Sequence, residues 1–156
     1  MRALLQRCSR ASVHVGQELV AEIGAGLVTF VGVGHDDDAR TADALARRIV
    51  ELRIFADDSG RAERSLLDVS GEVLVVSQFT LYADTSRGRR PGFTNAAPGE
   101  LAERLYGRVA ERLAALGVAR VATGRFGAEM AVELVNDGPF TIWLDTDDGP
   151  ASGGRT

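Results

Sequence analysis

The chain has 156 residues, of which 45% are hydrophobic and 26% charged, a composition typical of one soluble folded domain rather than a disordered or membrane-spanning chain. Its net charge of −4 excludes a protein that attracts nucleic acid through its overall charge, so a nucleic-acid contact must be local. Cys8 is the only cysteine, which excludes an internal disulfide and a cysteine-based metal centre and agrees with the cytoplasmic location we expect.

Short segments in the first third of the chain alternate apolar and polar residues, which predicts antiparallel strands. They cover residues 2–7, 11–15, 18–23 and 27–33. The period changes after three aspartates at 36–38, where a helix N-terminus favours negative charge. We expect a first helix over residues 39–52, with a buried face formed by Ala42, Leu45, Ile49 and Leu52.

The middle of the chain contains a loop and a strong strand signal. Residues 55–71 have the turn chemistry of a loop or hairpin. Residues 72–84, EVLVVSQFTLYAD, form the most strand-like run and are predicted as one strand.

The last third combines a helix with strands. A second helix is predicted from Pro98-Gly99 to Gly117, because apolar residues recur at helical spacing at Leu101, Leu105, Val109, Leu113 and Leu116. Further strands are expected at 118–123, 129–135 and 140–145, and a disordered tail at 146–156. Strands grouped around two separated helices predict an α+β domain, with an antiparallel-rich, barrel-like bent β-sheet covered by two main helices.

Polar residues interrupt the run at 72–84. Strand alternation places Ser77 and Phe79 on one side and Gln78 and Thr80 on the other. Buried polar groups need partners, so these side chains either bond to neighbouring backbone or line a pocket, and the sequence leaves both interpretations open. Thr80 as a nucleophile would need a base, but the chain has no lysine and no histidine near it in sequence.

The loop TSRGRRPGF at residues 85–93 holds a local cluster of positive charge. Arg87, Arg89 and Arg90 lie within four positions, among glycines and before an aromatic residue. Such a cluster is typical either of a solvated surface loop or of a contact with nucleic-acid phosphates.

Gly138-Pro139 lies between the last two predicted strands and also admits more than one interpretation. A trans Gly-Pro in a turn is the common case, because proline fixes φ and glycine bends freely. A cis bond occurs at about 5–6% of X–Pro positions and marks a required turn or a functional element. The dipeptide alone does not decide between them.

Two motifs together resemble one protein family. SQFTL at 77–81 and NDGPFT at 136–141 are similar to the signatures S-Q-x-x-L and N-x-G-P-x-T of the D-aminoacyl-tRNA deacylase (D-tyrosyl-tRNA(Tyr) deacylase) family. The segments that match in the same order are MRALLQR, SRASV, LRIFAD, GRRPGFT, TGRFGA and VELVNDGPFTIWLD. The resemblance extends to residue 145, so we expect one domain over residues 1–145.

The resemblance implies a hydrolase that cleaves the ester between a D-amino acid and the 3′ end of tRNA, spares L-aminoacyl esters, and attacks glycyl-tRNA mischarged on tRNA(Ala). It implies a homodimer with shared active sites. No metal site is visible in the sequence, and we expect no cofactor. In the family, a cis Gly-Pro enters the partner's site, where its carbonyls hold the substrate's α-amino group; that role would fall to Gly138 and Pro139. Arg7 resembles the residue that holds this segment in place.

The resemblance also implies a mechanism. Gln78 and backbone N–H groups near Phe79 would bind the ester oxygen as it becomes negative, while the terminal ribose 2′-hydroxyl of the RNA assists water. Ser77 and Thr80 would shape the adenosine pocket, whereas an alternative scheme makes Thr80 the nucleophile.

The arginine cluster would then contact phosphates at the acceptor end of the tRNA. Two other functions remain as alternatives: an enzyme that has drifted to another ester or amide on the same fold, and a non-catalytic tRNA-binding dimer. The motif residues argue against both, because a binding module needs no element that selects handedness.

Overall fold

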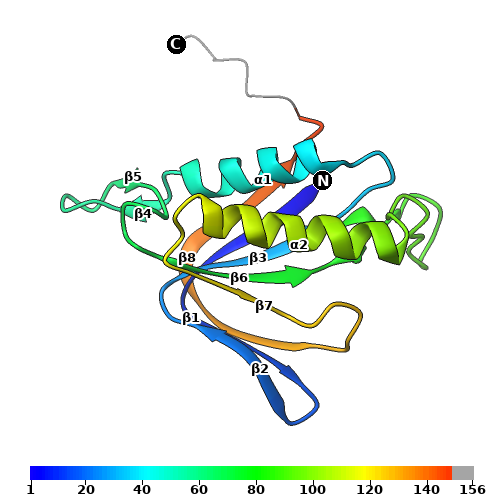
Figure 1. Cartoon of the computed structure of the whole chain (residues 1–156), viewed down its shortest axis with the longest axis horizontal. Helices are drawn as coiled ribbons and strands as arrows, with labels where there is room; N and C mark the ends of the chain where they lie inside the picture. Colours follow the sequence, from blue (N-terminus) through cyan, green and yellow to red (C-terminus); the bar gives the residue numbers. More distant parts are fainter. Residues whose placement is uncertain (149–156) are drawn as a thin grey trace.

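The structure, a computed structural model, describes residues 1–148 and has two layers, a strongly bent mixed β-sheet and two helices on one of its faces (Figure 1). The strands follow the order β2 (Glu18–Ile23), β1 (Arg2–Val15), β3 (Gly26–Gly32), β6 (Glu72–Ser77) and β7 (Arg120–Thr123), and β8 (Ala131–Asp145) pairs with β1. The helices are α1 (Ala39–Glu51) and α2 (Gly99–Ala115). The smaller elements are the hairpin of β4 (Phe55–Ala56) and β5 (Ala62–Arg64) and the 3₁₀-helix η1 (Phe79–Tyr82).

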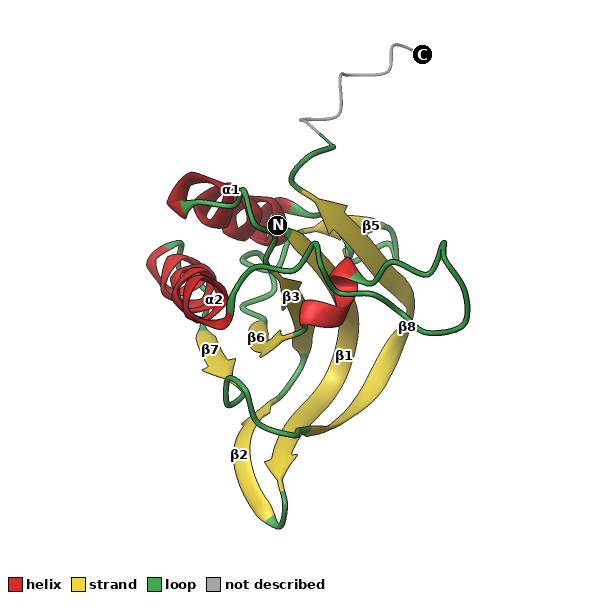
Figure 2. Cartoon of the chain, turned by 90° about the vertical axis from the view of Figure 1, so that its right-hand side faces the viewer, coloured by secondary structure: helices red, strands yellow, loops and turns green. Residues whose placement is uncertain are grey.

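β1 gives the sheet its barrel-like curvature (Figure 2), because it pairs with three other strands. Its first half pairs antiparallel with β3 and its second half with β2, while β8 follows its other edge from Arg2 to His14. β3, β6 and β7 continue the sheet in parallel. The predicted α+β class, with a barrel-like sheet and two covering helices, is confirmed, whereas the homodimer stays a prediction.

Alternating residues of the inner strands fill two cores. Val73 and Val75 of β6 face the core beneath the helices, and Leu74 faces the smaller core on the other side of the sheet. The buried face of α1 is Ala42, Leu45, Ala46, Ile49 and Val50. The helix begins as predicted after the aspartates, because the Asp38 carboxylate caps it by accepting from two backbone N–H groups.

Two pairs of predicted strands are each one continuous strand. β1 runs through residues 8–10, and β8 runs through Gly138-Pro139. The register of the β1–β8 ladder shifts near Cys8 but then resumes. The prediction of separate strands was wrong because β1 and β8 pair with each other along nearly their whole length. This pairing continues on both sides of the register shifts near Cys8.

The strand predicted over residues 72–84 ends at Ser77, so the alternation assumed for residues 77–82 is wrong. The chain leaves the strand at Gln78 (φ −146°, ψ 79°) and folds into η1. η1 packs directly on the end of β3, where a Cβ at Gly32 would lie 3.1 Å from the Leu81 Cβ and one at Gly34 would lie 2.9 Å from the Tyr82 hydroxyl. These glycines leave the room that lets the chain fold back over β3.

Only the first three residues of the predicted tail lie within the described part of the chain. There, the N–H of Thr146 donates to the carbonyl of Met1 (2.9 Å). The disorder predicted for residues 149–156 falls outside the described residues. Neither helix of residues 1–148 is long and apolar enough to cross a membrane.

Candidate active site

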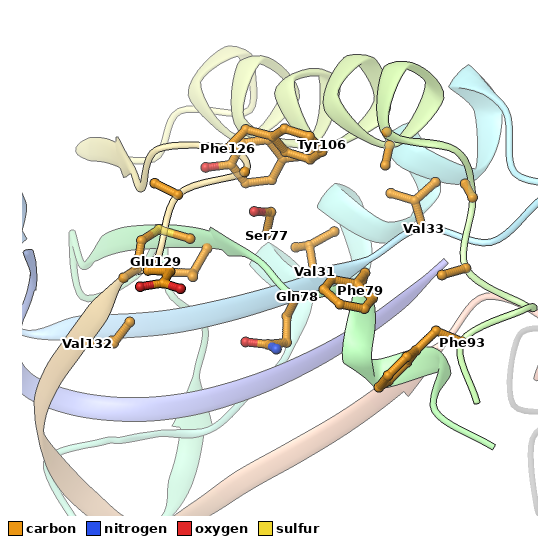
Figure 3. A pocket seen from close by; sticks show the side chains of 18 residues that line it. Val31, Val33, Ser77, Gln78, Phe79, Phe93, Tyr106, Phe126, Glu129 and Val132 are labelled. Atoms are coloured by element: carbon orange, nitrogen blue, oxygen red, sulfur yellow. The ribbon is translucent and has the colours of Figure 1, made fainter. Parts of the chain in front are cut away.

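A cavity of about 700 Å³ opens where β6 ends, beneath α2 (Figure 3). Ser77, Gln78 and Phe79 line it from the end of β6 and the start of η1. Tyr106 of α2 and Phe126, which follows β7, lie across the cavity from Gln78. This volume is within the range of small-molecule sites, so the cavity can enclose a ligand of nucleoside size.

Gln78 places hydrogen-bond donors at the cavity. Its backbone N–H donates to the Val31 carbonyl (2.7 Å), which ties the end of β6 to β3. Its side-chain nitrogen donates to the Thr80 hydroxyl, which leaves the second hydrogen of the amide for another acceptor. Among residues 1–148, the backbone N–H groups of Phe79 and Thr80 have no protein acceptor. This turn can therefore donate to a ligand oxygen that carries negative charge.

Aromatic rings form two walls of the cavity. Phe79, which is 55% exposed, meets Phe93 edge to face with ring centroids 5.0 Å apart. Tyr106 and Phe126 lie 5.9 Å apart on the other wall. The Tyr106 hydroxyl donates to the Val75 carbonyl (3.0 Å), and burial raises the pKa of Tyr106 to about 12, so the phenol stays neutral. Such walls suit the flat ring of a nucleobase.

The connection between β7 and β8 supplies the third wall, through residues 126–130. Glu129 is the only charged residue among the described residues that line the cavity (Figure 3). Within residues 1–148, no group of three His, Cys, Asp or Glu side chains could hold a metal ion.

Gly138 and Pro139 form a second group with Arg7, apart from this cavity. Neither lines it within one chain, both are exposed on β8, and the peptide bond between them is cis. The Arg7 guanidinium donates to the carbonyls of Asp137 (2.9 Å) and Gly138 (3.1 Å). It also lies over the Phe140 ring, 4.6 Å from its centroid. Arg7 thus holds an exposed stretch of backbone.

The arginine cluster lies in an exposed loop at the rim of the cavity. Two backbone hydrogen bonds between Asp84 and Gly92 (2.8 and 2.9 Å) close the loop, and Phe93, the next residue, lines the cavity. The exposed side chains of the loop include Arg87, Arg89 and Arg90. His35 donates to the Thr94 carbonyl (2.7 Å), so it serves here as a structural contact.

The sequence profile of the family described as D-Tyr-tRNA(Tyr) deacylase matches residues 4–145. The chain belongs to this family. A deacylase relative from Roseiflexus sp. (strain RS-1), named D-aminoacyl-tRNA deacylase, is 60% identical over 146 residues, which cover 94% of each chain. Another of the same name, from Cereibacter sphaeroides (strain ATCC 17029 / ATH 2.4.9), is 56% identical over 146 residues, 94% of this chain and 100% of that one. The predicted family is confirmed.

Solved structures agree with this deacylase fold. The structure titled "c-Myc DNA Unwinding Element Binding Protein" has a TM-score of 0.88 and 39% identity and covers 97% of this chain and 100% of that one. A "probable eukaryotic D-amino acid tRNA deacylase" has a TM-score of 0.81 at 18% identity, over 92% of this chain and 97% of that one, and supports the fold alone.

The deacylase structure brings together only part of the predicted site. Ser77, Gln78 and Phe79 line one cavity, and Thr80 contacts it through Gln78, whereas the Gly-Pro group with its arginine lies elsewhere. Of the lining residues, sequence reasoning named only Ser77, Gln78 and Phe79 as site residues, and it missed the others, including Tyr106, Phe126 and Glu129. The family-like segment TGRFGA marked Phe126, but nothing in the helical spacing of α2 distinguished position 106.

Proposed function

We propose that the chain is a chiral-editing hydrolase that acts on D-aminoacyl-tRNA in the cytoplasm and releases the free D-amino acid and tRNA. The observation that carries the proposal is the placement of Gln78 and its neighbouring N–H groups at a nucleoside-sized cavity, in a member of the deacylase family. An aminoacyl ester is already reactive. Donors aimed at the oxygen on which negative charge develops are therefore a sufficient contribution from the protein.

The substrate itself supplies the group that assists water. Among the described residues that line the cavity there is no lysine or histidine, and Glu129, in the β7–β8 connection, is the one carboxylate. The Thr80 hydroxyl contacts the Gln78 amide. In every 3′-aminoacyl ester of tRNA, the 2′-hydroxyl of the terminal ribose lies next to the ester. This hydroxyl assists the attacking water, while Gln78 and the Phe79 N–H bind the ester oxygen.

A second copy of the chain completes the site. Gly138 and Pro139 are exposed and line no cavity found among the described residues of their own chain, although Arg7 donates to the carbonyls of Asp137 and Gly138. Among the described residues, β8 pairs only with β1, and it exposes the apolar Val135 and Trp143. An unpaired edge with apolar side chains suits a symmetric contact between two copies.

In this dimer the Gly-Pro backbone selects handedness. Its carbonyls bind the α-ammonium group of the substrate, and the backbone excludes a side chain that points toward it, whatever that side chain is. Glycine has no side chain to exclude. Glycyl-tRNA, including glycine mischarged on tRNA(Ala), is therefore hydrolysed as well.

A Thr80→Ala enzyme should keep most of its kcat on D-tyrosyl-tRNA. It loses one neutral hydrogen bond with Gln78, an effect of about 1 kcal/mol or roughly fivefold in rate. Thr80→Ser keeps the hydroxyl and should match the wild type. Single-turnover rates of the three proteins test this, and a loss of several orders of magnitude in Thr80→Ala with unchanged tRNA binding would make Thr80 the nucleophile.

Neutralising the loop arginines with Arg89→Gln and Arg90→Gln together should raise KM for D-tyrosyl-tRNA and leave kcat unchanged. Each lost phosphate contact lowers the slope of log affinity against log salt by about 0.7–0.9. The control is Arg61→Gln with Arg64→Gln, an equal charge change in the β4–β5 hairpin. The test is to measure KM over a range of salt concentrations. If both double variants keep the wild-type slope, the loop is a solvated surface loop and does not contact the tRNA phosphates.

A further inference from the structure

The barrel has an open seam between β2 and β7. These strands stand at the two ends of the strand order and pack against each other, but no ladder joins them among residues 1–148. An ion pair crosses the seam: Arg125, just after β7, donates to both carboxylate oxygens of Glu18, the first residue of β2 (2.9 and 3.1 Å). A bidentate pair fixes orientation as well as distance.

Folding stability does not explain this pair. The Arg125 side chain is 47% exposed and that of Glu18 is 61% exposed, and ion pairs at such positions contribute little to the free energy of folding. The hydrogen bond from Arg125 and its charge hold the pKa of Glu18 below its usual range, so the pair stays charged at neutral pH.

What the pair holds is a wall of the cavity, because residues 126–130 follow Arg125 directly. On the side of the helices, this segment is anchored at Gly124, whose N–H donates to the Val75 carbonyl (2.9 Å). The Tyr106 hydroxyl, which donates to the same Val75 carbonyl (3.0 Å), lies 3.4 Å from the Gly124 carbonyl. On the side of β2, the segment is anchored by the ion pair of Arg125 with Glu18. Phe126 directly follows Arg125 and lies two positions after Gly124 in sequence.

We propose that Glu18 and Arg125 are positioning residues: their ion pair holds residues 126–130 where they enclose the 3′-terminal nucleoside of the substrate. This inference rests on the proposed function. An irregular connection is less rigid than a strand, so a wall built from one needs side-chain support. Neither residue lines the cavity. The pair therefore sets KM and leaves kcat unchanged.

The chain offers a matched control pair. Arg108 of α2 donates to both carboxylate oxygens of Asp43 of α1 (2.8 Å each), with side chains 45% and 31% exposed. This pair has the same chemistry and a similar exposure, joins α1 to α2, and neither Asp43 nor Arg108 lines the cavity. Substitutions there remove an equivalent ion pair without touching the wall.

The test uses full-length Glu18→Gln, Arg125→Gln, the exchanged pair Glu18→Arg/Arg125→Glu, and the controls Asp43→Asn and Arg108→Gln. KM and kcat are measured on D-tyrosyl-tRNA, and Kd is measured calorimetrically for an adenosine that carries D-tyrosine through a stable 3′-amide. The two single variants should raise KM and Kd about fivefold at unchanged kcat. The exchanged pair should recover most of this loss, and the controls should match the wild type.

Unchanged KM and Kd in the single variants, an equal change in the control pair, or an exchanged pair as weak as the single variants would each overturn the proposal. The amide separates this result from the proposed function. A wild-type protein that binds the amide but does not hydrolyse D-tyrosyl-tRNA contradicts the proposed function, while the Kd values of the variants still decide the role of the ion pair.

Discussion

A Gln78→Ala enzyme is expected to hydrolyse D-tyrosyl-tRNA roughly 100-fold more slowly than the wild type, since removal of one oxyanion donor costs about 10²–10³ in kcat. The Gln78 amide has one hydrogen on the Thr80 hydroxyl and one free for the ester oxygen. That interaction strengthens only as negative charge develops, so KM should change little. Single-turnover rates with excess enzyme measure the effect.

Gln78→Glu is the control for side-chain volume. It nearly preserves the shape of the side chain but replaces two N–H donors with a carboxylate, so it should be at least as slow as Gln78→Ala. If Gln78→Ala instead raised KM and kept a wild-type kcat, Gln78 would bind the substrate without stabilising the transition state.

Replacement of Arg7 by lysine should lower kcat/KM on D-tyrosyl-tRNA by about 10- to 100-fold. The Arg7 side chain is only 11% exposed and donates to three carbonyls, those of Asp137, Gly138 and Ile54 (2.9, 3.1 and 2.5 Å). Lysine keeps the charge but lacks the planar fork, and each lost hydrogen bond from a charged donor costs about 1.5–3 kcal/mol. Arg10→Lys, at an exposed position of the same strand, is the matched control and should leave kcat/KM on D-tyrosyl-tRNA unchanged.

A mixed dimer shows whether the Arg7 effect acts on the partner's cavity. One subunit carries Gln78→Ala and the other carries Arg7→Lys, with different affinity tags for purification of the mixed species. If the Gly-Pro group serves the opposite cavity, one of the two sites has both parts intact, and activity returns to about half of the wild type. If each chain forms its own site, both sites stay impaired. A single-chain mass in solution would also contradict the shared site.

The fold could be predicted where local patterns agreed with tertiary packing. The helices followed from apolar spacing and from the capping aspartate before α1. The segment after Ser77 could not, because its apolar alternation is equally compatible with a strand, and only the packing of η1 on Gly32 and Gly34 decides against one. The unbroken β8 likewise depends on its distant partner β1.

Only the part of the candidate site that lies within the two sequence motifs could be predicted. The motif at 77–81 contains Ser77, Gln78 and Phe79, which line the cavity, and the motif at 136–141 contains Gly138 and Pro139, which do not. Local patterns do not reveal this difference. Contacts between residues far apart in the sequence could not be predicted from local patterns either. Arg125 and Glu18 lie 107 positions apart, and no local sequence pattern around either residue indicates that the two form an ion pair.

The first measurement to make is deacylation of D-tyrosyl-tRNA, L-tyrosyl-tRNA and glycyl-tRNA by the purified wild-type protein, with a chelator in a parallel set. Chiral editing by a backbone wall predicts rapid hydrolysis of the D-tyrosyl and glycyl esters, with the L-tyrosyl ester spared, and the same rates in both sets. Equal hydrolysis of the D- and L-tyrosyl esters, or hydrolysis of neither, would contradict it.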